Sequence, residues 1–101
     1  MSVLVTVRVR GDVDQFRRVL KDEPERFREI APEAKAAGAI HHRFGIGDGF
    51  VLAVDEWESA EAFQAFFQSS EKVAAIIRDA GGSPEPPEIV ITEAINSPDE
   101  F

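Results

Sequence analysis

Residues 39–57, AIHHRFGIGDGFVLAVDEW, decide the fold of this chain because they contain two strand-like segments joined by a glycine-rich turn. We expect a strand at Ala39–Phe44, a turn at Gly45–Gly49 and a return strand at Phe50–Trp57. The three glycines of the turn supply the positive φ angles that a tight hairpin connection needs. The segment therefore predicts an antiparallel hairpin in the middle of the chain.

The segment before the hairpin contains one strand and one helical region. Every second residue from 3 to 9 is valine, a pattern typical of a β-strand. Asp12 and Gln15 have the spacing of a helix start, with Asp12 as the N-cap. Pro24 and Pro32 lie within the helical pattern that follows. We expect the helix to kink or restart at each, because proline cannot donate the intrahelical hydrogen bond.

The segment after the hairpin predicts a helix, a connector and a last strand. Ser59 is placed to cap a helix that runs to the glycine pair at 81–82. A proline-rich connector follows, and Ile89, Ile91 and Ile95 alternate along the final strand.

The resulting order of elements, βαββαβ, predicts a single α+β domain over residues 1–101, with a short acidic tail at 96–101. We expect a ferredoxin-like fold, in which two helices cover one face of a four-stranded antiparallel sheet. A chain of 101 residues is too short for two domains that each bury a core. Cysteine is absent, so a disulfide framework and thiolate chemistry are excluded.

Charge and hydropathy exclude several classes of partner. The net charge of −8 disfavours nucleic acid, and no basic stripe compensates for it. The first ten residues lack the apolar block of a signal peptide, and no apolar run is long enough to span a membrane. We therefore expect a cytoplasmic protein that binds neither nucleic acid nor membrane.

Both faces of the return strand are apolar, and this predicts an oligomer. An antiparallel sheet with helices on one side normally shows polar residues on the other. Here both sets are hydrophobic: Val51, Ala53 and Trp57 on one face, and Phe50, Leu52 and Val54 on the other. We expect the uncovered face to pack against a second copy of the chain, as a homodimer.

Residues 38–44, GAIHHRF, and 50–63, FVLAVDEWESAEAF, resemble the antibiotic biosynthesis monooxygenase (ABM) group of dimeric α/β-barrel proteins. The resemblance implies a dimeric barrel with a pocket between sheet and helices in each subunit. That group includes cofactor-independent, quinone-forming monooxygenases and haem-degrading enzymes. The features of the haem-degrading branch do not match, since the first strand has no asparagine and the second helix has no histidine. We expect neither haem degradation nor any other cofactor or metal.

The candidate site follows from this resemblance. His42 is the candidate general base, because a neutral imidazole can accept a proton near pH 7. The candidate ligand-binding residues are Trp57, Phe63, Phe66 and Phe67, which would form the walls of a pocket for a small hydrophobic or aromatic molecule. The same residues also fit a plain structural role, with His42 hydrogen-bonded in a core or interface and the aromatic side chains packed in the core.

The expected pairing of the hairpin keeps His42 away from carboxylates. A five-residue turn pairs Phe44 with Phe50, and this places His42 opposite Leu52. Asp55 would then reach His42 only diagonally.

Two functions remain open. One is a cofactor-independent monooxygenase acting on a small aromatic or polyketide-like substrate. The other is a non-catalytic dimeric protein that binds a small ligand or has a structural role.

Overall fold

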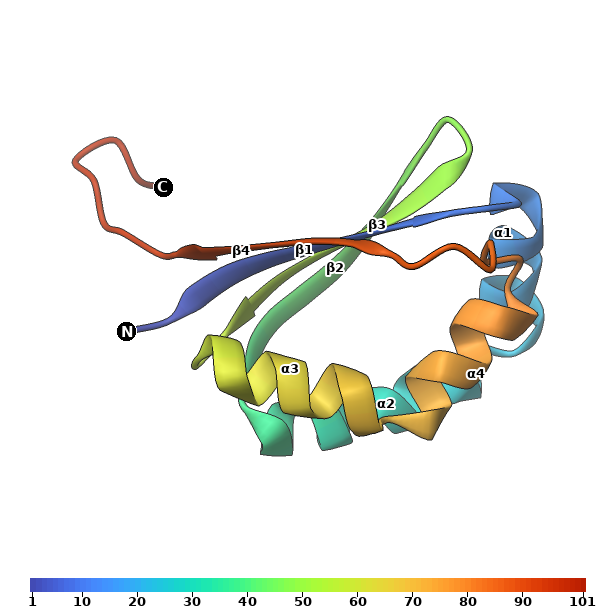
Figure 1. Ribbon diagram of the computed structural model, residues 1–101, viewed down its shortest axis with the longest axis horizontal. Coiled ribbons are helices and arrows are strands. Elements are labelled where there is room, and N and C mark those ends of the chain that lie inside the picture. The colour runs from blue at the N-terminus through green and yellow to red at the C-terminus, as the bar shows by residue number, and fades with distance from the viewer.

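The computed structural model describes residues 1–101 and shows a layer of helices against one face of a sheet (Figure 1). The elements in chain order are β1 (Val3–Arg10), α1 (Val13–Asp22), α2 (Pro24–Ala37), β2 (Ala39–Gly47), β3 (Phe50–Trp57), α3 (Ala60–Ser69), α4 (Glu71–Asp79) and β4 (Glu88–Glu93). The strands are antiparallel in the order β2-β3-β1-β4. The predicted α+β, ferredoxin-like fold is confirmed. No helix is both long and apolar enough to cross a lipid bilayer.

Each of the two expected helical regions is divided into two helices. Pro24 occupies the first turn of α2, where its missing N–H costs nothing, so the predicted restart there is confirmed. α2 continues through Pro32, so the helix does not restart there. The second break was not expected. The Ser70 side chain accepts a hydrogen bond from the Val73 N–H at 3.2 Å and so caps α4 as a new helix.

Asp12 caps α1 as predicted. Its Oδ1 accepts hydrogen bonds from the N–H groups of Asp14 and Gln15, at 3.0 and 3.2 Å. Gln15 does not complete a capping box. Its amide instead donates to the carbonyl oxygen of Asp79 at 3.2 Å and so joins the start of α1 to the end of α4.

The hairpin register differs from the expected one. β2 continues to Gly47, which pairs with Phe50, and only Asp48 and Gly49 form the loop. Gly49 has a φ of 77°, so the short loop uses a single left-handed residue. Gly47 is the last residue of β2, and its position favours glycine, because a Cβ there would lie 2.1 Å from the Phe50 ring. The expected Phe44–Phe50 pair was therefore wrong by three positions, and Phe44 pairs with Ala53.

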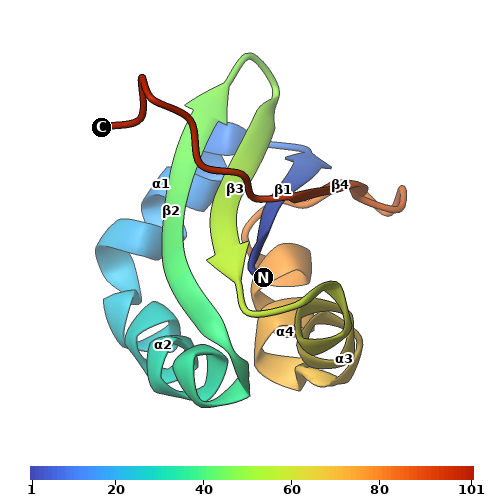
Figure 2. The same ribbon diagram turned by 90° about the vertical axis from the view of Figure 1, so that its left-hand side faces the viewer.

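The eight buried hydrophobic residues form two separate clusters. The first lies where α3 meets the sheet and contains Val5, Val7, Trp57 and Phe63. The second lies between α1 and α4 and contains Phe16, Val19, Ile76 and Ala80. In both views α2 and α3 lie side by side beneath the sheet (Figure 1, Figure 2). The space between the two clusters holds the candidate site.

The face of the sheet opposite the helices is uncovered and partly apolar. Leu4, Val54 and Val90 are 47%, 48% and 57% exposed there. Phe50 shares this face, and the Arg8 guanidinium lies 4.1 Å from its ring centroid. The last strand ends at Glu93, so the predicted inclusion of residue 95 in it was wrong.

Candidate functional site

A cavity of about 470 Å³ lies between the sheet and the helices. It is lined by 31 residues, of which 21 are hydrophobic, and they come from all four helices and from β1, β2 and β3. This volume is in the range of small-molecule binding pockets. Residues of both core clusters contribute to its walls, because neither cluster extends far enough to fill the space between them.

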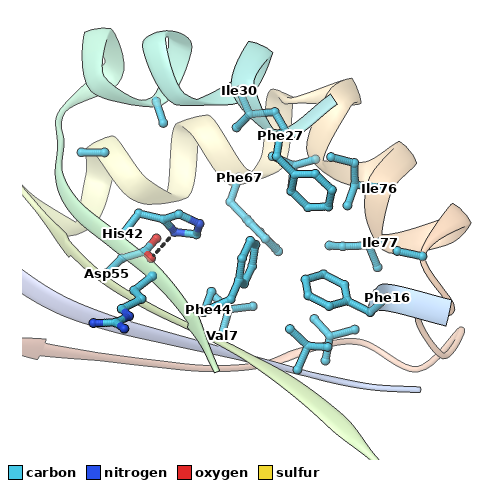
Figure 3. Close-up of a pocket in the computed structure, with 18 of the residues that line it drawn as sticks. Val7, Phe16, Phe27, Ile30, His42, Phe44, Asp55, Phe67, Ile76 and Ile77 are labelled. Atoms are coloured by element: carbon cyan, nitrogen blue, oxygen red, sulfur yellow. Dashed lines mark hydrogen bonds and ion pairs between the residues drawn. The ribbon is translucent and has the colours of Figure 1, made fainter. Parts of the chain in front are cut away.

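Phenylalanine rings are prominent in the wall, and Figure 3 shows four of them, Phe16, Phe27, Phe44 and Phe67. Phe16, Phe27 and Phe44 meet edge to face, with centroid distances of 5.2 to 6.1 Å. Phe63 and Phe67 are stacked at 5.4 Å. Such ring packing defines a fixed apolar surface suited to a flat ligand.

One polar group interrupts this wall. His42 Nδ1 lies 2.7 Å from Asp55 Oδ1, and Trp57 Nε1–H donates to Asp55 Oδ2 at 3.0 Å. The Asp55 side chain is 9% exposed, whereas that of His42 is 48% exposed. The carboxylate is therefore enclosed between two N–H donors, and the imidazole extends from it towards the open part of the cavity (Figure 3).

This arrangement fixes the chemistry of the imidazole. A carboxylate can only accept, so the Nδ1 that faces it carries the proton. In the neutral ring Nε2 then has the free lone pair, and no protein group bonds to Nε2. The His42 ring also packs edge to face on Phe44 at 4.6 Å, which holds its orientation. The pair can accept a proton from a ligand at Nε2.

The hairpin register brings these residues together. His42 pairs directly with Asp55 across β2 and β3, so their side chains lie on the same face of the sheet. Trp57 is two residues further along β3 and shares that face. A register irregularity between Ala39 and His41 allows β2 to follow the end of β3.

The predicted site residues all line the cavity. These are His42, Trp57, Phe63, Phe66 and Phe67. Trp57 and Phe63 are buried members of the first core cluster, so their role is partly structural. Asp55 was not expected to reach His42 directly, and the correct register reverses that prediction.

Sequence reasoning also missed three of the wall residues, Phe16, Phe27 and Phe44. Phe16 and Phe27 recur at helical spacing in the sequence, but this spacing carries no signal of a cavity.

His41 lies on the opposite face of the sheet from His42, because side chains of neighbouring strand residues alternate between the two faces. It pairs with Glu56, whose carboxylate accepts a hydrogen bond from the Ser2 hydroxyl. Asp55 and Glu56 therefore do not form a carboxylate pair.

An exposed ion pair joins the helices at the end of the cavity remote from His42. Arg26 of α2 donates to Asp79 at the end of α4 at 2.8 Å. The hydrogen bond from Arg26 lowers the pKa of Asp79, and a second bond from Arg78 acts in the same direction. No group of three or more acidic, histidine or cysteine side chains comes together as a set of metal ligands.

Solved structures show which known proteins share this architecture. SnoaB, a cofactor-independent oxygenase from Streptomyces nogalater, has a TM-score of 0.63 at 17% identity, with 98% of each chain covered. A monooxygenase from the gene ActVA-Orf6 of Streptomyces coelicolor, determined with the ligand nanaomycin D, has a TM-score of 0.66 at 16% identity. That match covers 95% of this chain and 89% of the other. A proposed antibiotic biosynthesis monooxygenase from Bordetella bronchiseptica has a TM-score of 0.64 at 12% identity, with 94% and 98% covered.

The fold is that of the ABM structures. The resemblance noted in residues 38–63 is therefore confirmed at the level of fold. No family model and no curated protein sequence matches the chain. ABM-like proteins, like those of other widely used folds, can differ in reaction, so the function has to be argued from the site.

Proposed function

We propose that this chain is a cytoplasmic, ABM-like, homodimeric enzyme that oxygenates a small aromatic or polyketide-like substrate without an added cofactor. The observation that carries the proposal is the Asp55-held imidazole of His42, with Nε2 unbonded, in the wall of an apolar cavity. Two structures with the same fold are described as a cofactor-independent oxygenase and as a monooxygenase, and this supports the reaction type.

The geometry suits an oxygenation that begins with proton removal. Nε2 of His42 takes a proton from an activated methylene group and leaves a carbanion stabilised by the aromatic rings of the substrate. The carbanion reduces O2 and combines with it to form a peroxide anion, which His42 reprotonates. Loss of water from the hydroperoxide breaks the O–O bond and the second C–H bond. One methylene and one O2 thus give one ketone and one water, with a general-base contribution of about 10²–10⁴-fold.

The apolar walls of the cavity have two roles in this reaction. Phe44 and Phe67 hold a flat substrate beside the imidazole (Figure 3). The low polarity also keeps water away from the carbanion, which would otherwise be reprotonated.

A second candidate function is binding without catalysis. The observation that favours it is the scarcity of polar groups, because His42 with Asp55 is the one polar pair directed into the cavity. A single base is still sufficient for the proposed oxygenation, because O2 is the only co-reactant that the reaction needs.

The homodimer is proposed from the uncovered sheet face. Leu4, Val54 and Val90 are each about half exposed on it, and Phe50 and Leu52 lie among them. Packing this face against its own copy would bury these side chains symmetrically. It would also leave the cavity, which opens on the opposite side of the sheet, free in each subunit.

Oxygen uptake with anthrone, a tricyclic molecule with an activated methylene, tests the function. The comparison is between wild type, His42→Gln and His41→Gln. Glutamine can still donate to Asp55 but has no basic nitrogen, so His42→Gln should lower the rate by about 10²-fold or more. The neighbouring substitution lies on the other face and should leave the rate unchanged. Equal rates for all three folded proteins would reject the proposal in favour of a binding protein.

A further inference from the structure

Helix α2 packs differently from the other three helices. α1, α3 and α4 each place at least one buried side chain in a core cluster, whereas α2 has no buried residue over its whole length. Five of its residues nevertheless line the cavity: Phe27, Ile30, Ala31, Ala34 and Lys35. Figure 3 shows Phe27 and Ile30 directed into it. α2 is therefore a wall of the cavity that is held only by partly buried side chains.

The mouth of the cavity lies between α2 and the edge strand β2. Three residues of β2 that line the cavity are exposed: Ile40 at 44%, the His42 side chain at 48% and Phe44 at 37%. Ala31 and Lys35 of α2 also line the cavity and are exposed. Figure 2 shows α2 on the β2 side of the molecule, with α3 and α4 on the other side. A ligand that enters by this mouth passes along α2.

Both ends of α2 have the backbone features of a hinge. Glu23 lies between α1 and α2 with a φ of −132° and a ψ of 52°, and its side chain does not cap the new helix. Gly38, at the other end, has a φ of 122°, which favours glycine. Hinges in proteins are a few residues at the ends of elements that absorb changes in φ and ψ. α2 is a rigid segment between two such positions.

Two exposed ion pairs fasten α2 to α4. Arg26, in the first turn of α2, donates to Asp79 at the end of α4 at 2.8 Å. Lys72, in the first turn of α4, donates to Glu33 of α2. The four side chains are 29% to 48% exposed, so water and salt weaken both pairs. Such pairs hold one position of the helix and release it at small cost in free energy.

We propose that α2 is a lid over the cavity, which swings on Glu23 and Gly38 and is latched to α4 by these two ion pairs. Opening widens the mouth between α2 and β2 and admits a ligand. Closing forms the Arg26–Asp79 and Lys72–Glu33 pairs again and keeps water away from the bound molecule. A binding protein with this cavity needs the same entrance, so the lid does not depend on the proposed oxygenation.

Cysteine labelling tests the lid, because the chain has no cysteine of its own. Val7 and Val5 lie on the same face of β1 and are 5% and 0% exposed, but only Val7 lines the cavity. With N-ethylmaleimide as the probe, Val7→Cys should be labelled about tenfold or more faster than Val5→Cys. Its rate should be nearly independent of low urea concentrations, whereas the rate of Val5→Cys should follow global unfolding. Equal rates with the same urea dependence would overturn the lid.

A cross-link distinguishes a moving lid from a static opening. Glu33→Cys and Lys72→Cys replace one latch, and bismaleimidoethane joins the two exposed thiols. In this protein the labelling of Val7→Cys should slow by about tenfold or more, towards the rate of global unfolding. The control carries Glu25→Cys and Arg28→Cys, which are joined within α2 and leave the helix free to swing. Equal labelling in the two cross-linked proteins would overturn the proposal.

Removing both latches should have the opposite effect. Arg26→Gln with Lys72→Gln should raise the labelling rate of Val7→Cys by about threefold, because each exposed pair has a small effect. Arg28→Gln removes a pair within α2 and should leave the rate unchanged. An unchanged rate in the double variant would contradict the assignment of the two pairs as the latch. The labelling needs no substrate, so none of these outcomes decides the proposed function.

Discussion

Asp55→Asn isolates the carboxylate that orients the imidazole. The carboxylate accepts hydrogen bonds from His42 and from Trp57, one on each oxygen. An asparagine amide has one accepting oxygen and one donating nitrogen, so it can serve only one of these two N–H groups. The substitution changes shape very little, which makes it a test of hydrogen bonding rather than of packing.

The burial of the two donors decides which bond survives. Trp57 is 2% exposed and cannot bond to water instead, whereas the His42 side chain is 48% exposed. The amide oxygen will therefore face Trp57, and the amide nitrogen will face Nδ1 of His42. Nδ1 must then accept, so the imidazole proton moves to Nε2 and the lone pair that acts as base is lost.

The expected magnitudes differ for activity and for stability. Loss of the base should lower the oxygenation rate on anthrone by about 10²–10⁴-fold. Replacing one charged hydrogen bond should cost about 1–3 kcal/mol of unfolding free energy. In a domain of this size the melting temperature should fall by about 4–8 °C per kcal/mol.

Oxygen uptake, thermal melting and ¹⁵N NMR of the imidazole measure these three effects on the same samples. The NMR signal should report a proton on Nδ1 in wild type and on Nε2 in the variant at a pH where the ring is neutral. Glu56→Gln is the matched control, since it makes the same chemical change on the opposite face of β3. An Asp55→Asn protein that is fully active and keeps the Nδ1 proton would show that Asp55 does not set the tautomer of His42.

Three further predictions concern assembly, packing and pH. Light scattering of wild type should give about twice the 11.1 kDa chain mass. Val54→Glu, in the middle of the uncovered face, should give the mass of the monomer. A wild-type protein with the mass of one chain at every concentration would contradict the dimer. Gly11→Ala places a Cβ 2.1 Å from the carbonyl oxygen of Gly81 and should lower the free energy of unfolding, measured in urea, by about 2 kcal/mol or more. Gly45→Ala is the control: its Cβ meets nothing within 4 Å, so the loss should be less than about 0.5 kcal/mol. Because the pKa of Asp79 is lowered in the fold, its ion pair adds stability above the unfolded pKa of about 4, and this stability is lost as the pH falls through the lower folded value. Asp79→Asn should therefore lose less stability than wild type on acidification below about pH 4, and identical acid profiles would show that the pair contributes nothing.

The order of elements could be predicted from the sequence because each strand and each helix start has a local signal. The alternating valines of β1 and the Asp12 cap act over a few residues, and the structure retains both. The break at Ser70 was missed because apolar residues at helical spacing, such as Phe66, Phe67, Val73 and Ile77, continue across it. Ser70 followed by Glu71 is typical of a helix N-terminus, with serine as the N-cap and an acidic residue in the first turn, and this pair could have indicated the new helix.

The error in the predicted hairpin register changed the predicted site more than the predicted fold. Treating all of Gly45–Gly49 as turn moved His42 opposite Leu52, whereas Asp48-Gly49 alone is a favoured two-residue hairpin loop. Counting back from that loop pairs His42 with Asp55. The cavity itself could not be predicted, because a phenylalanine at helical spacing looks the same in a filled core and in a pocket wall.

Isotope labelling shows whether the oxygen atom of the product comes from O2 and whether its transfer needs His42. Wild-type protein, freed of metal by a chelator, is given anthrone under ¹⁸O2, and the product is analysed by mass spectrometry. We expect anthraquinone with one ¹⁸O atom per molecule and the other ¹⁸O atom in water, formed about 10²-fold or more slowly by His42→Gln. Unlabelled product, or labelled product formed equally fast by His42→Gln, would contradict the proposed oxygenation.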